Sequence, residues 1–429
     1  MNVVDSEVVV AILQQHNYQL TEEVTEADLV LINTCSIRDN AEQRVRSRLR
    51  EFKRIKQQNG GVSVGVIGCM AERLKEKLLE EETVVDLVVG PDAYRELPAL
   101  LQEVESGQKG INTLLSMEET YGDIRPVRMD RNHVTSFVAI MRGCNNYCAY
   151  CVVPGTRGRE RSRDPETIIR EATGLFKKGY REVTLLGQNV NSYRWVNGSR
   201  DLTFENLLEQ VAKIDPLLRV RFATSHPKDM SDELLRMMAR FPNLCKAIHL
   251  PVQSGSSAVL ERMKRKYTRE HYMERISAMQ KHLPGVSIST DIIAGFCGET
   301  EEEHQQTLSL MEWVGYDFAY MFKYSERPDT FAANKYKDDI PDKVKSRRLQ
   351  EIIQLQNRLS LESKELDVGQ TYEVLVEGTS KKSKEHLFGR TSQNKVVVFP
   401  KGTFKQGDYV DVTINSCTSA TLIGTPVHS

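Results

Sequence analysis

The sequence predicts a multidomain α/β protein: an N-terminal doubly wound α/β domain, a central partial (β/α)6 barrel and a small C-terminal β-barrel. Three observations predict it. Apolar runs alternate with amphipathic segments over the first hundred residues, which is typical of a parallel sheet covered by helices. A second alternating block holds six strand–helix units, two fewer than a complete eight-stranded barrel. After Gly369 the pattern changes to short alternating strands punctuated by glycine and serine, which favours a five-stranded barrel.

The expected elements follow in chain order. In the N-terminal domain, residues 1–125, we expect strands at 29–33, 62–67 and 84–89, and helices at 5–18, 37–57, 71–80 and 91–105. A doubly wound domain normally opens with a strand, whereas this chain opens with a helix. The first strand is therefore expected to lie before Met1. Residues 106–132 are polar, are broken by glycine and proline, and are expected to form a linker.

The central domain, residues 130–363, and the tail, residues 366–429, follow the linker. Central strands are expected at 136–141, 182–186, 219–223, 246–250, 287–293 and 318–322, with helices at 165–178, 203–214, 232–239, 269–282, 301–314 and 342–364. Tail strands are expected at 372–376, 388–391, 395–399, 409–414 and 420–424.

Composition excludes several classes of protein. The 429 residues hold 58 Lys and Arg against 59 Asp and Glu, so the net charge of −1 gives no global sign of nucleic acid or membrane. There is no run of about 18 apolar residues, and the acidic start lacks the features of a secretory signal. We therefore expect a cytoplasmic protein without a membrane span. Thiols stay reduced there, so the eight cysteines indicate metal binding or catalysis.

The most specific motif is Cys144-Asn-Asn-Tyr-Cys148-Ala-Tyr-Cys151, directly after a predicted barrel strand. A structural zinc site takes four ligands, whereas three thiolates on a four-iron cluster leave the fourth iron open to a small molecule. The alternatives are three incidental buried thiols, or a zinc site that borrows a distant histidine.

Two further cysteines, Cys35 and Cys69, each end a predicted parallel strand. Ligands of open α/β sheets bind at the carboxyl ends of the strands, so these thiols could hold a second cluster. Equally, they could be two small buried hydrophobic residues.

Polar residues follow the barrel strands at the end where a barrel binds its ligands. Each could instead be a loop cap. They are Gln188, Asn189, Thr224, Ser225, His226, Gln253, Ser254 and Asp291.

Charge is uneven along the chain. Residues 38–56 hold eight cations against three acids, and Arg157, Arg159, Arg161 and Arg163 face only Glu160. The tail clusters lysines at 381–384. Such patches suit RNA phosphates, although each could be a solvated surface.

In combination, a cysteine-bearing α/β domain, a CxxxCxxC barrel and a small β-barrel tail resemble the methylthiotransferase family of radical S-adenosylmethionine (SAM) enzymes over essentially the whole chain. The segments MRGCNNYC (141–148), VVPGTRGRERSR (152–163), LGQNVNSY (186–193) and HLPVQSGS (249–256) most resemble the branch that acts on N6-dimethylallyladenosine in tRNA. The resemblance implies that the barrel is a radical SAM domain and that the tail is a TRAM domain.

The resemblance also implies two [4Fe-4S] clusters and SAM as cofactors. Cys144, Cys148 and Cys151 would hold the radical SAM cluster, and Cys35 and Cys69 an auxiliary cluster. SAM contacts are implied for Tyr150, Gln188, Asn189, Ser225, Gln253 and Asp291.

The implied reaction is methylthiolation of carbon 2 of N6-dimethylallyladenosine beside the anticodon, at position 37. One SAM donates the methyl group and another is the radical source. The implied partners are the tRNA anticodon stem-loop and a reductant protein such as a flavodoxin, and the implied state is a monomer. The alternatives are a sister enzyme acting on threonylcarbamoyl-adenosine or on a ribosomal-protein aspartate, and a non-catalytic RNA-binding iron–sulfur protein.

Three positions depart from the family pattern. The third auxiliary cysteine of the family would lie before Met1 and is not in this chain. Gly155 stands where the family has tyrosine, and Cys297 stands where it has proline. Cys297 is interpreted as a loop substitution, and Cys245 and Cys417 as structural.

Overall fold

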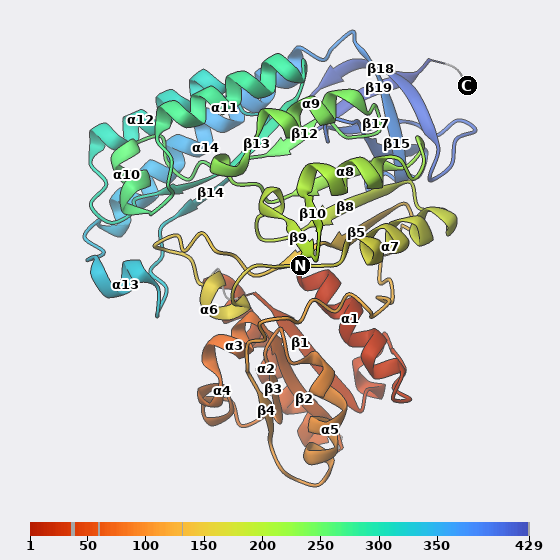
Figure 1. Cartoon of the computed structure of the whole chain (residues 1–429), viewed down its shortest axis with the longest axis vertical. Coiled ribbons are helices and arrows are strands. Elements are labelled where there is room, and N and C mark those ends of the chain that lie inside the picture. The colour runs from red at the N-terminus through yellow and green to blue at the C-terminus, as the bar shows by residue number, and fades with distance from the viewer. Residues whose placement is uncertain (36–38, 59–60, 131, 428–429) are drawn as a thin grey trace. The chain divides into compact units, whose positions relative to one another are not determined.

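The computed structural model describes residues 1–35, 39–58, 61–130 and 132–427, and the chain forms two compact units (Figure 1). The N-terminal unit comprises residues 1–129, 141–164 and 327–334. The barrel unit comprises residues 130–140, 165–326 and 335–429. The segment that carries Cys144, Cys148 and Cys151 therefore folds with the N-terminal residues and not with the barrel strands that flank it in sequence. No helix of the described residues is long and apolar enough to cross a bilayer.

The N-terminal unit is built on a four-stranded parallel sheet of order β1-β2-β3-β4. Its strands are β1 (Leu29–Thr34), β2 (Ser63–Gly68), β3 (Leu87–Val89) and β4 (Gly110–Asn112). The three expected strands are confirmed, although β3 begins at Leu87 rather than at residue 84. The linker interpretation was wrong at β4, because this short strand lies within residues 106–132 and pairs with β3. The strand expected before Met1 stays a prediction.

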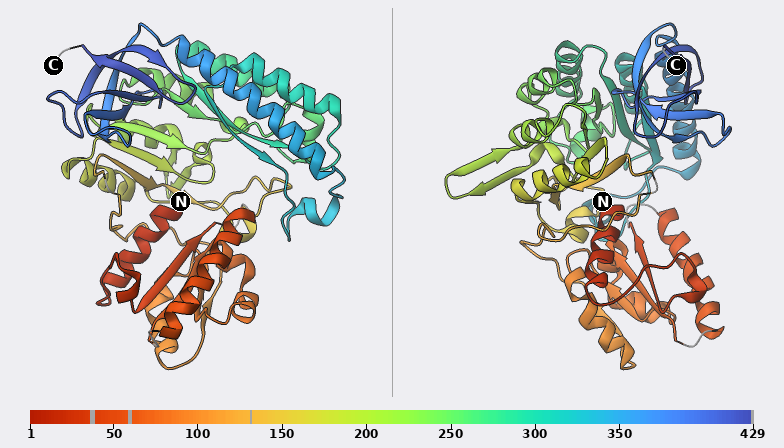
Figure 2. Two further views of the ribbon diagram at one scale, coloured as in Figure 1. Left: turned by 180° about the vertical axis from the view of Figure 1, so that it is seen from behind. Right: turned by 90° about the vertical axis from the view of Figure 1, so that its right-hand side faces the viewer.

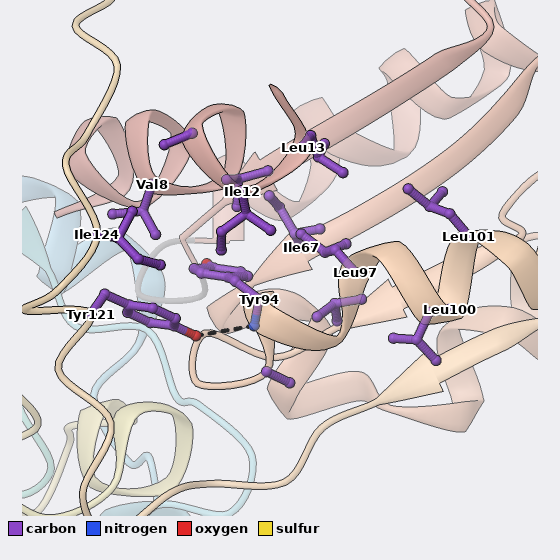
Figure 3. Close-up of a cluster of buried hydrophobic side chains, with 14 of the residues drawn as sticks. Val8, Ile12, Leu13, Ile67, Tyr94, Leu97, Leu100, Leu101, Tyr121 and Ile124 are labelled. Carbon is purple, nitrogen blue, oxygen red and sulfur yellow. Dashed lines mark hydrogen bonds between the residues drawn. The ribbon is translucent and has the colours of Figure 1, made fainter. Parts of the chain in front are cut away.

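Helices cover both faces of this sheet. On one face, α1 (Asn2–Gln14) and α5 (Leu97–Glu105) pack around Ile67, Tyr94 and Tyr121 in the cluster that Figure 3 shows. On the other face, α2 (Asp39–Gln58) packs with residues of β2. The Tyr94 backbone N–H donates to the Tyr121 hydroxyl at 3.0 Å, which ties the segment after β4 to this core.

Three helix expectations in this unit were wrong in their borders. The helix expected at 91–105 is α5, which begins only at Leu97, after a separate 3-10 turn at Tyr94–Glu96. Helix α1 ends at Gln14 rather than Tyr18, because Asn17 adopts a left-handed conformation with φ of 67°. The single helix expected at 71–80 is two helices, α3 (Cys69–Leu74) and α4 (Glu76–Glu81), separated at Lys75 with φ of 50°. The expected start of α2 at Ile37 lies outside the described residues.

The barrel unit contains the six parallel strands that the sequence predicted (Figure 2). They form two sheets, β11-β8-β5 and β12-β13-β14, and a bridge between Val220 and Leu244 links β11 to the chain just before β12. The strands are β5 (Thr135–Ala139), β8 (Glu182–Leu186), β11 (Arg219–Ala223), β12 (Ala247–His249), β13 (Ser287–Ala294) and β14 (Phe318–Lys323). The intervening helices are α7 (Pro165–Lys177), α8 (Phe204–Ala212), α9 (Asp232–Arg240), α10 (Ser257–Arg262), α11 (Arg269–His282), α12 (Glu301–Val314) and α14 (Asp342–Glu365). A hairpin of β9 (Arg194–Asn197) and β10 (Arg200–Thr203) was not predicted.

The tail forms the expected closed five-stranded barrel, in the order β15-β16-β17-β19-β18. Its strands are β15 (Thr371–Thr379), β16 (His386–Arg390), β17 (Val396–Pro400), β18 (Tyr409–Cys417) and β19 (Leu422–Pro426). Its core consists of apolar residues from all five strands, among them Val374, Phe399 and Leu422.

Side chains of β11 hold the tail barrel in place. Arg219 donates to the Arg390 carbonyl at 2.7 Å and Arg221 to the Thr391 carbonyl at 2.7 Å. The Tyr409 hydroxyl donates to the Leu217 carbonyl at 2.8 Å, just before β11 begins. These contacts lie at the amino-terminal ends of the barrel strands. The tail therefore packs at the amino-terminal ends of these strands. The ligand-binding residues were expected at the other end, after the carboxyl ends of the strands.

Candidate functional site

The cysteine loop, residues 143–160, is closed at its base by a short antiparallel ladder. Its two strands are β6 (Met141–Arg142) and β7 (Arg161–Ser162). Gly143 begins the loop at φ of 76°, and a Cβ there would lie 2.0 Å from the Arg159 carbonyl oxygen, so only glycine fits. The Cys144 N–H donates to the Gly158 carbonyl at 3.2 Å, which closes the loop further.

The thiols of the loop fit a cluster better than a single ion. Cys144, Cys148 and Cys151 are all half-buried, and burial raises the pKa of the Cys144 thiol. Ligands of one tetrahedral zinc lie within about 4 Å of each other. The three sulfurs are not gathered to that extent in the described chain. Thiolates of a four-iron cluster bind different irons and lie further apart, so this donor set suits a [4Fe-4S] cluster.

A single group of described residues is compact enough for one metal ion: Glu301, His304 and Glu351, in the barrel unit. Two guanidinium groups already neutralise its carboxylates. Arg347 donates to Glu301 and to Glu351 at 2.6 Å, and Arg348 contacts Glu301 at 3.3 Å. This group is therefore an ion-pair cluster between α12 and α14.

A buried ion network fixes both ends of the cysteine loop. Arg142 precedes the loop, Arg157 lies in α6 (Val153–Arg157) within it, and both donate to Asp5 of α1, at 2.9 and 2.6 Å. All three side chains are at most 4% exposed. Although burial raises it, the two guanidinium groups hold the pKa of Asp5 below its ordinary value. Asp5 therefore stays ionised and anchors α1 to the loop.

The interpretation of the arginine run 157–163 as a phosphate-binding patch was wrong for three of its four members. Arg157, Arg161 and Arg163 are only 4%, 7% and 6% exposed. Arg161 donates to Asp92 at 2.9 Å and to the Ser116 carbonyl. Buried arginine requires such partners, and the sequence could not show them because Asp5 and Asp92 are far away in the chain. Arg159 alone of the four is exposed.

The basic run of α2 divides in a similar way. Arg46 pairs with Glu82 at 2.8 Å, and Lys56 pairs with Asp86. Arg38 lies outside the described residues. The exposed cations of the helix are Arg44, Arg48, Arg50, Lys53 and Arg54, of which Arg48 pairs with Glu51.

Cys35 and Cys69 leave the sheet side by side. They follow Thr34 of β1 and Gly68 of β2, which are partners in the parallel register. Helix α3, which begins at Cys69, packs against α6 of the cysteine loop. The two cysteines and the cysteine loop therefore belong to one compact unit.

Unpartnered polar atoms surround the start of α3. The Asn33 Oδ1, Tyr94 hydroxyl and Arg157 Nη1 atoms are buried without a hydrogen-bond partner. A Cβ on Gly68 would lie 2.7 Å from Asn33 Oδ1 and 3.6 Å from the Tyr94 hydroxyl, so these two atoms converge on Gly68, and the Arg157 charge interacts with Cys69, the next residue. Buried donors without partners are rare, and the Arg157 and Tyr94 donors fit an anionic group such as a cluster.

The residues expected at the strand ends of β8 and β11 do lie together. The Val190 N–H donates to the Thr224 carbonyl at 2.9 Å and joins the two loops. Thr224 has φ of 73°, a rare conformation for a β-branched residue and one that clusters at binding sites. Several buried polar atoms here have no partner among the described residues: Gln188 Oε1, Asn189 Oδ1, Asn191 Nδ2, Ser225 Oγ and His226 Nε2.

Gln253 and Asp291 are adjacent through the backbone, because the Gln253 N–H donates to the Asp291 carbonyl at 2.8 Å. Gln253 also has a positive φ, 72°. The Asp291 carboxylate lies 3.4 Å from Nε2 of His249. Tyr150 lies in the cysteine loop of the N-terminal unit, and its contact with SAM stays a prediction.

Three partly exposed rings near Asp291 were not among the residues predicted for the site: His249, Phe318 and Tyr320. The signal was present, since β14 places Phe318, Tyr320 and Phe322 at every second position. Because side chains two residues apart on a strand point the same way, this alternation places the rings on one face of the strand.

Three regions of the chain match known protein families. Residues 138–311 match the radical SAM superfamily, residues 1–90 match uncharacterized protein family UPF0004, and residues 365–427 match the TRAM domain. A tRNA-2-methylthio-N(6)-dimethylallyladenosine synthase of Bacteroides fragilis is 57% identical over 430 residues, covering 100% of this chain and 94% of that protein. The protein of the same name from Amoebophilus asiaticus is 56% identical, covering 99% and 90%. The chain belongs to this synthase family.

The fold of this chain also resembles that of solved structures. The radical SAM methyltransferase TsrM from Kitasatospora setae, with tryptophan and a SAM analogue bound, aligns with a TM-score of 0.56. The alignment covers 77% of the present synthase-family chain and 72% of that chain, at 15% identity. At that identity the likeness concerns the fold alone.

Proposed function

We propose that the chain is a radical SAM methylthiotransferase that modifies carbon 2 of N6-dimethylallyladenosine beside the anticodon of tRNA, at position 37. The cysteine loop is the observation that supports this proposal. It presents three half-buried thiols, the β6–β7 ladder closes its base, and the chain belongs to the synthase family. The relatives named above do not favour the sister activities on threonylcarbamoyl-adenosine or on a protein aspartate.

Cys144, Cys148 and Cys151 would hold the [4Fe-4S] cluster that this superfamily uses with SAM. Such a cluster supplies the electron that cleaves SAM. The role of the chain is to fix the loop: Gly143 permits its turn, and Asp5 holds the arginines at positions 142 and 157.

A second cluster at Cys35 and Cys69 is also proposed. Their adjacent strand ends support it, as do the unpartnered Tyr94 hydroxyl near Gly68 and the Arg157 guanidinium, whose charge interacts with Cys69. For SAM itself we propose contacts with Gln188, Asn189, Ser225, Gln253 and Tyr150, and the SAM contact expected for Asp291 stays a prediction. SAM carries an ammonium, a carboxylate, ribose hydroxyls and an adenine, and the unpartnered atoms at the ends of β8 and β11 offer both donors and acceptors to such groups.

Electrons would come from a reductant protein such as a flavodoxin, and the chain would act as a monomer in the cytoplasm. The tRNA anticodon stem-loop would contact the TRAM barrel through exposed lysines: Lys381, Lys382, Lys384, Lys401 and Lys405. By contrast, Lys395 pairs with Asp367 at 2.7 Å and Arg390 with Glu377 at 3.1 Å, so these two tail cations hold the fold together.

Replacing Lys381, Lys382 and Lys384 together with serine is expected to weaken tRNA binding and to reduce its salt dependence. Each lost phosphate contact lowers the slope of log K against log salt by about 0.7 to 0.9. Binding titrations between 50 and 300 mM salt would measure this. Lys178→Ser, at an exposed position after α7, is the control and should leave the slope unchanged. An unchanged slope in the triple variant would remove the loop from the RNA interface.

The reaction itself has a direct test. The chain, reconstituted with iron and sulfide under anaerobic conditions, is incubated with SAM, a reductant and tRNA that carries N6-dimethylallyladenosine. Mass spectrometry of the digested tRNA should show the 2-methylthio nucleoside. Formation of 5′-deoxyadenosine without any thiolated nucleoside would contradict the proposed function for this chain, and tRNA carrying threonylcarbamoyl-adenosine is the control substrate.

A further inference from the structure

One face of the sheet formed by β12, β13 and β14 carries half-exposed aromatic side chains. The parallel register pairs His249 with Ser289 and Ser289 with Phe318. Two residues further along the strands it pairs Asp291 with Tyr320. Residues paired in register and two apart share a face, so these five side chains form one surface, which we call the aromatic face.

The opposite face of the same sheet is fully covered. Ile288, Thr290 and Ile292 alternate with the residues of the aromatic face and are 3%, 0% and 0% exposed. Helix α14 packs against β13 and β14. Parallel sheets are normally buried on both faces, but Phe318 and Tyr320 are 48% and 50% exposed. Large exposed aromatic side chains grouped in this way mark a binding surface.

The rings are arranged around a hydrogen-bonding pair. Phe318 and Tyr320 have ring centroids 4.8 Å apart at 84°, and His249 and Tyr320 are 5.8 Å apart at 80°. The His249 imidazole lies between two oxygens, with Nδ1 3.0 Å from Ser289 Oγ and Nε2 3.4 Å from Asp291 Oδ1. The aromatic face therefore offers π surface directly beside a carboxylate acceptor.

We propose that the aromatic face binds the target base of the tRNA, with the purine stacked on Tyr320 and its apolar N6 substituent against Phe318. This inference rests on the proposed function and names the residues that recognise its substrate. Enzymes that modify a base extrude it from the stack and hold it between aromatic side chains. Stacking is sequence-tolerant, whereas the Asp291 carboxylate accepts a hydrogen bond from an N6 amino hydrogen and so selects adenine.

Two observations favour the tRNA base over the adenine of SAM as the occupant. The aromatic face and the TRAM barrel belong to the same compact unit. The barrel contacts the start of β14 on the side that α14 covers, where Asp317 lies 3.3 Å from the Lys395 Nζ atom and accepts from Ser363. The unpartnered polar atoms that suit the polar groups of SAM gather instead at the ends of β8 and β11.

The test compares two anticodon stem-loops, one with N6-dimethylallyladenosine at the target position and one with an abasic site there. Fluorescence anisotropy without SAM gives both Kd values. The wild-type chain should bind the base-containing RNA about tenfold more tightly, because one stacked base contributes about that factor. Tyr320→Ala should bring the two Kd values together while leaving that of the abasic RNA unchanged. Tyr320→Phe should restore the difference.

The control variant is Trp313→Ala, on α12, whose side chain is 46% exposed and whose loss should preserve the tenfold difference. Equilibrium dialysis with SAM supplies the second readout. If Tyr320→Ala lowers SAM affinity and keeps the RNA difference, the face holds the adenine of SAM and the inference is overturned. A wild-type chain that binds both RNAs equally overturns the inference alone. A wild-type chain that binds neither RNA overturns the proposed function as well.

Discussion

Replacing Cys144 with alanine is expected to remove about four irons per chain and to abolish reductive cleavage of SAM. A four-iron cluster needs its three thiolates, and the loop that presents them has no fourth sulfur to substitute. If Cys35 and Cys69 hold a second cluster, about eight irons in the wild type fall to about four in the variant. Iron and sulfide analysis of the reconstituted chain, with detection of 5′-deoxyadenosine, measures both effects.

The matched control for that variant is Cys245→Ala. Cys245 is buried in the barrel unit, where burial raises the pKa of its thiol to about 11, which is unsuitable for a metal ligand. Its removal should leave the iron content unchanged. The converse variant, Cys69→Ala, should lower the iron content but keep SAM cleavage. Full iron content in Cys144→Ala would show that the loop holds no cluster.

Asp5→Asn is expected to destabilise the N-terminal unit by about 3 to 5 kcal/mol, because it leaves two buried guanidinium groups without a compensating charge. Arg142 and Arg157 are 2% and 4% exposed and both donate to Asp5. Hydrogen exchange followed by mass spectrometry should show lost protection in α1 and in the cysteine loop. Both tryptophans, Trp195 and Trp313, lie in the barrel unit, so tryptophan fluorescence would not report this change.

The ion pairs that Asp5 makes with the two buried arginines also make the stability of the N-terminal unit depend on pH. The pKa of Asp5 is lower in the folded chain than in the unfolded chain, so its stabilising effect is fully present above the unfolded value of about 3.9. The effect is lost as the pH falls through the lower folded pKa. Asp5→Asn should remove this acid dependence from the exchange of α1. Asp201→Asn breaks an exposed pair with Arg194 and should leave α1 protection unchanged, and equal losses in both variants would contradict the assigned role of Asp5.

The two proposals about substrate depend on different residues, and their failures are separable. Lys381, Lys382 and Lys384 act through phosphates, so their removal changes the salt dependence for any RNA of the same length. Tyr320 acts through one base, so its removal changes only the difference between the two stem-loops. A chain with both changes should show both effects independently, because the sites share no contact and distant effects add.

Much of the chemistry was readable from sequence because it depends on local spacing. The positions of Cys144, Cys148 and Cys151 predict a cluster loop within eight residues of chain. Likewise, β8 and β11 were predicted with correct borders, since each is a short stretch in which apolar residues alternate or group before a polar loop. The five-stranded tail was predicted by alternation and glycine placement.

Other features depend on residues that meet only after folding. The sequence by itself determined the three-part fold, the cluster motif and the polar strand ends, because helix and strand periods and ligand spacing are local properties. Only the tertiary structure decided that Arg157 and Arg161 are buried partners of Asp5 and Asp92 rather than phosphate ligands. It also decided that the cysteine loop folds with the N-terminal unit, and that one face of β14 is left uncovered. The reason is physical: burial and ion pairing are set by neighbours that are distant in sequence, 152 residues away for Arg157 and 69 for Arg161, and no local pattern encodes their approach.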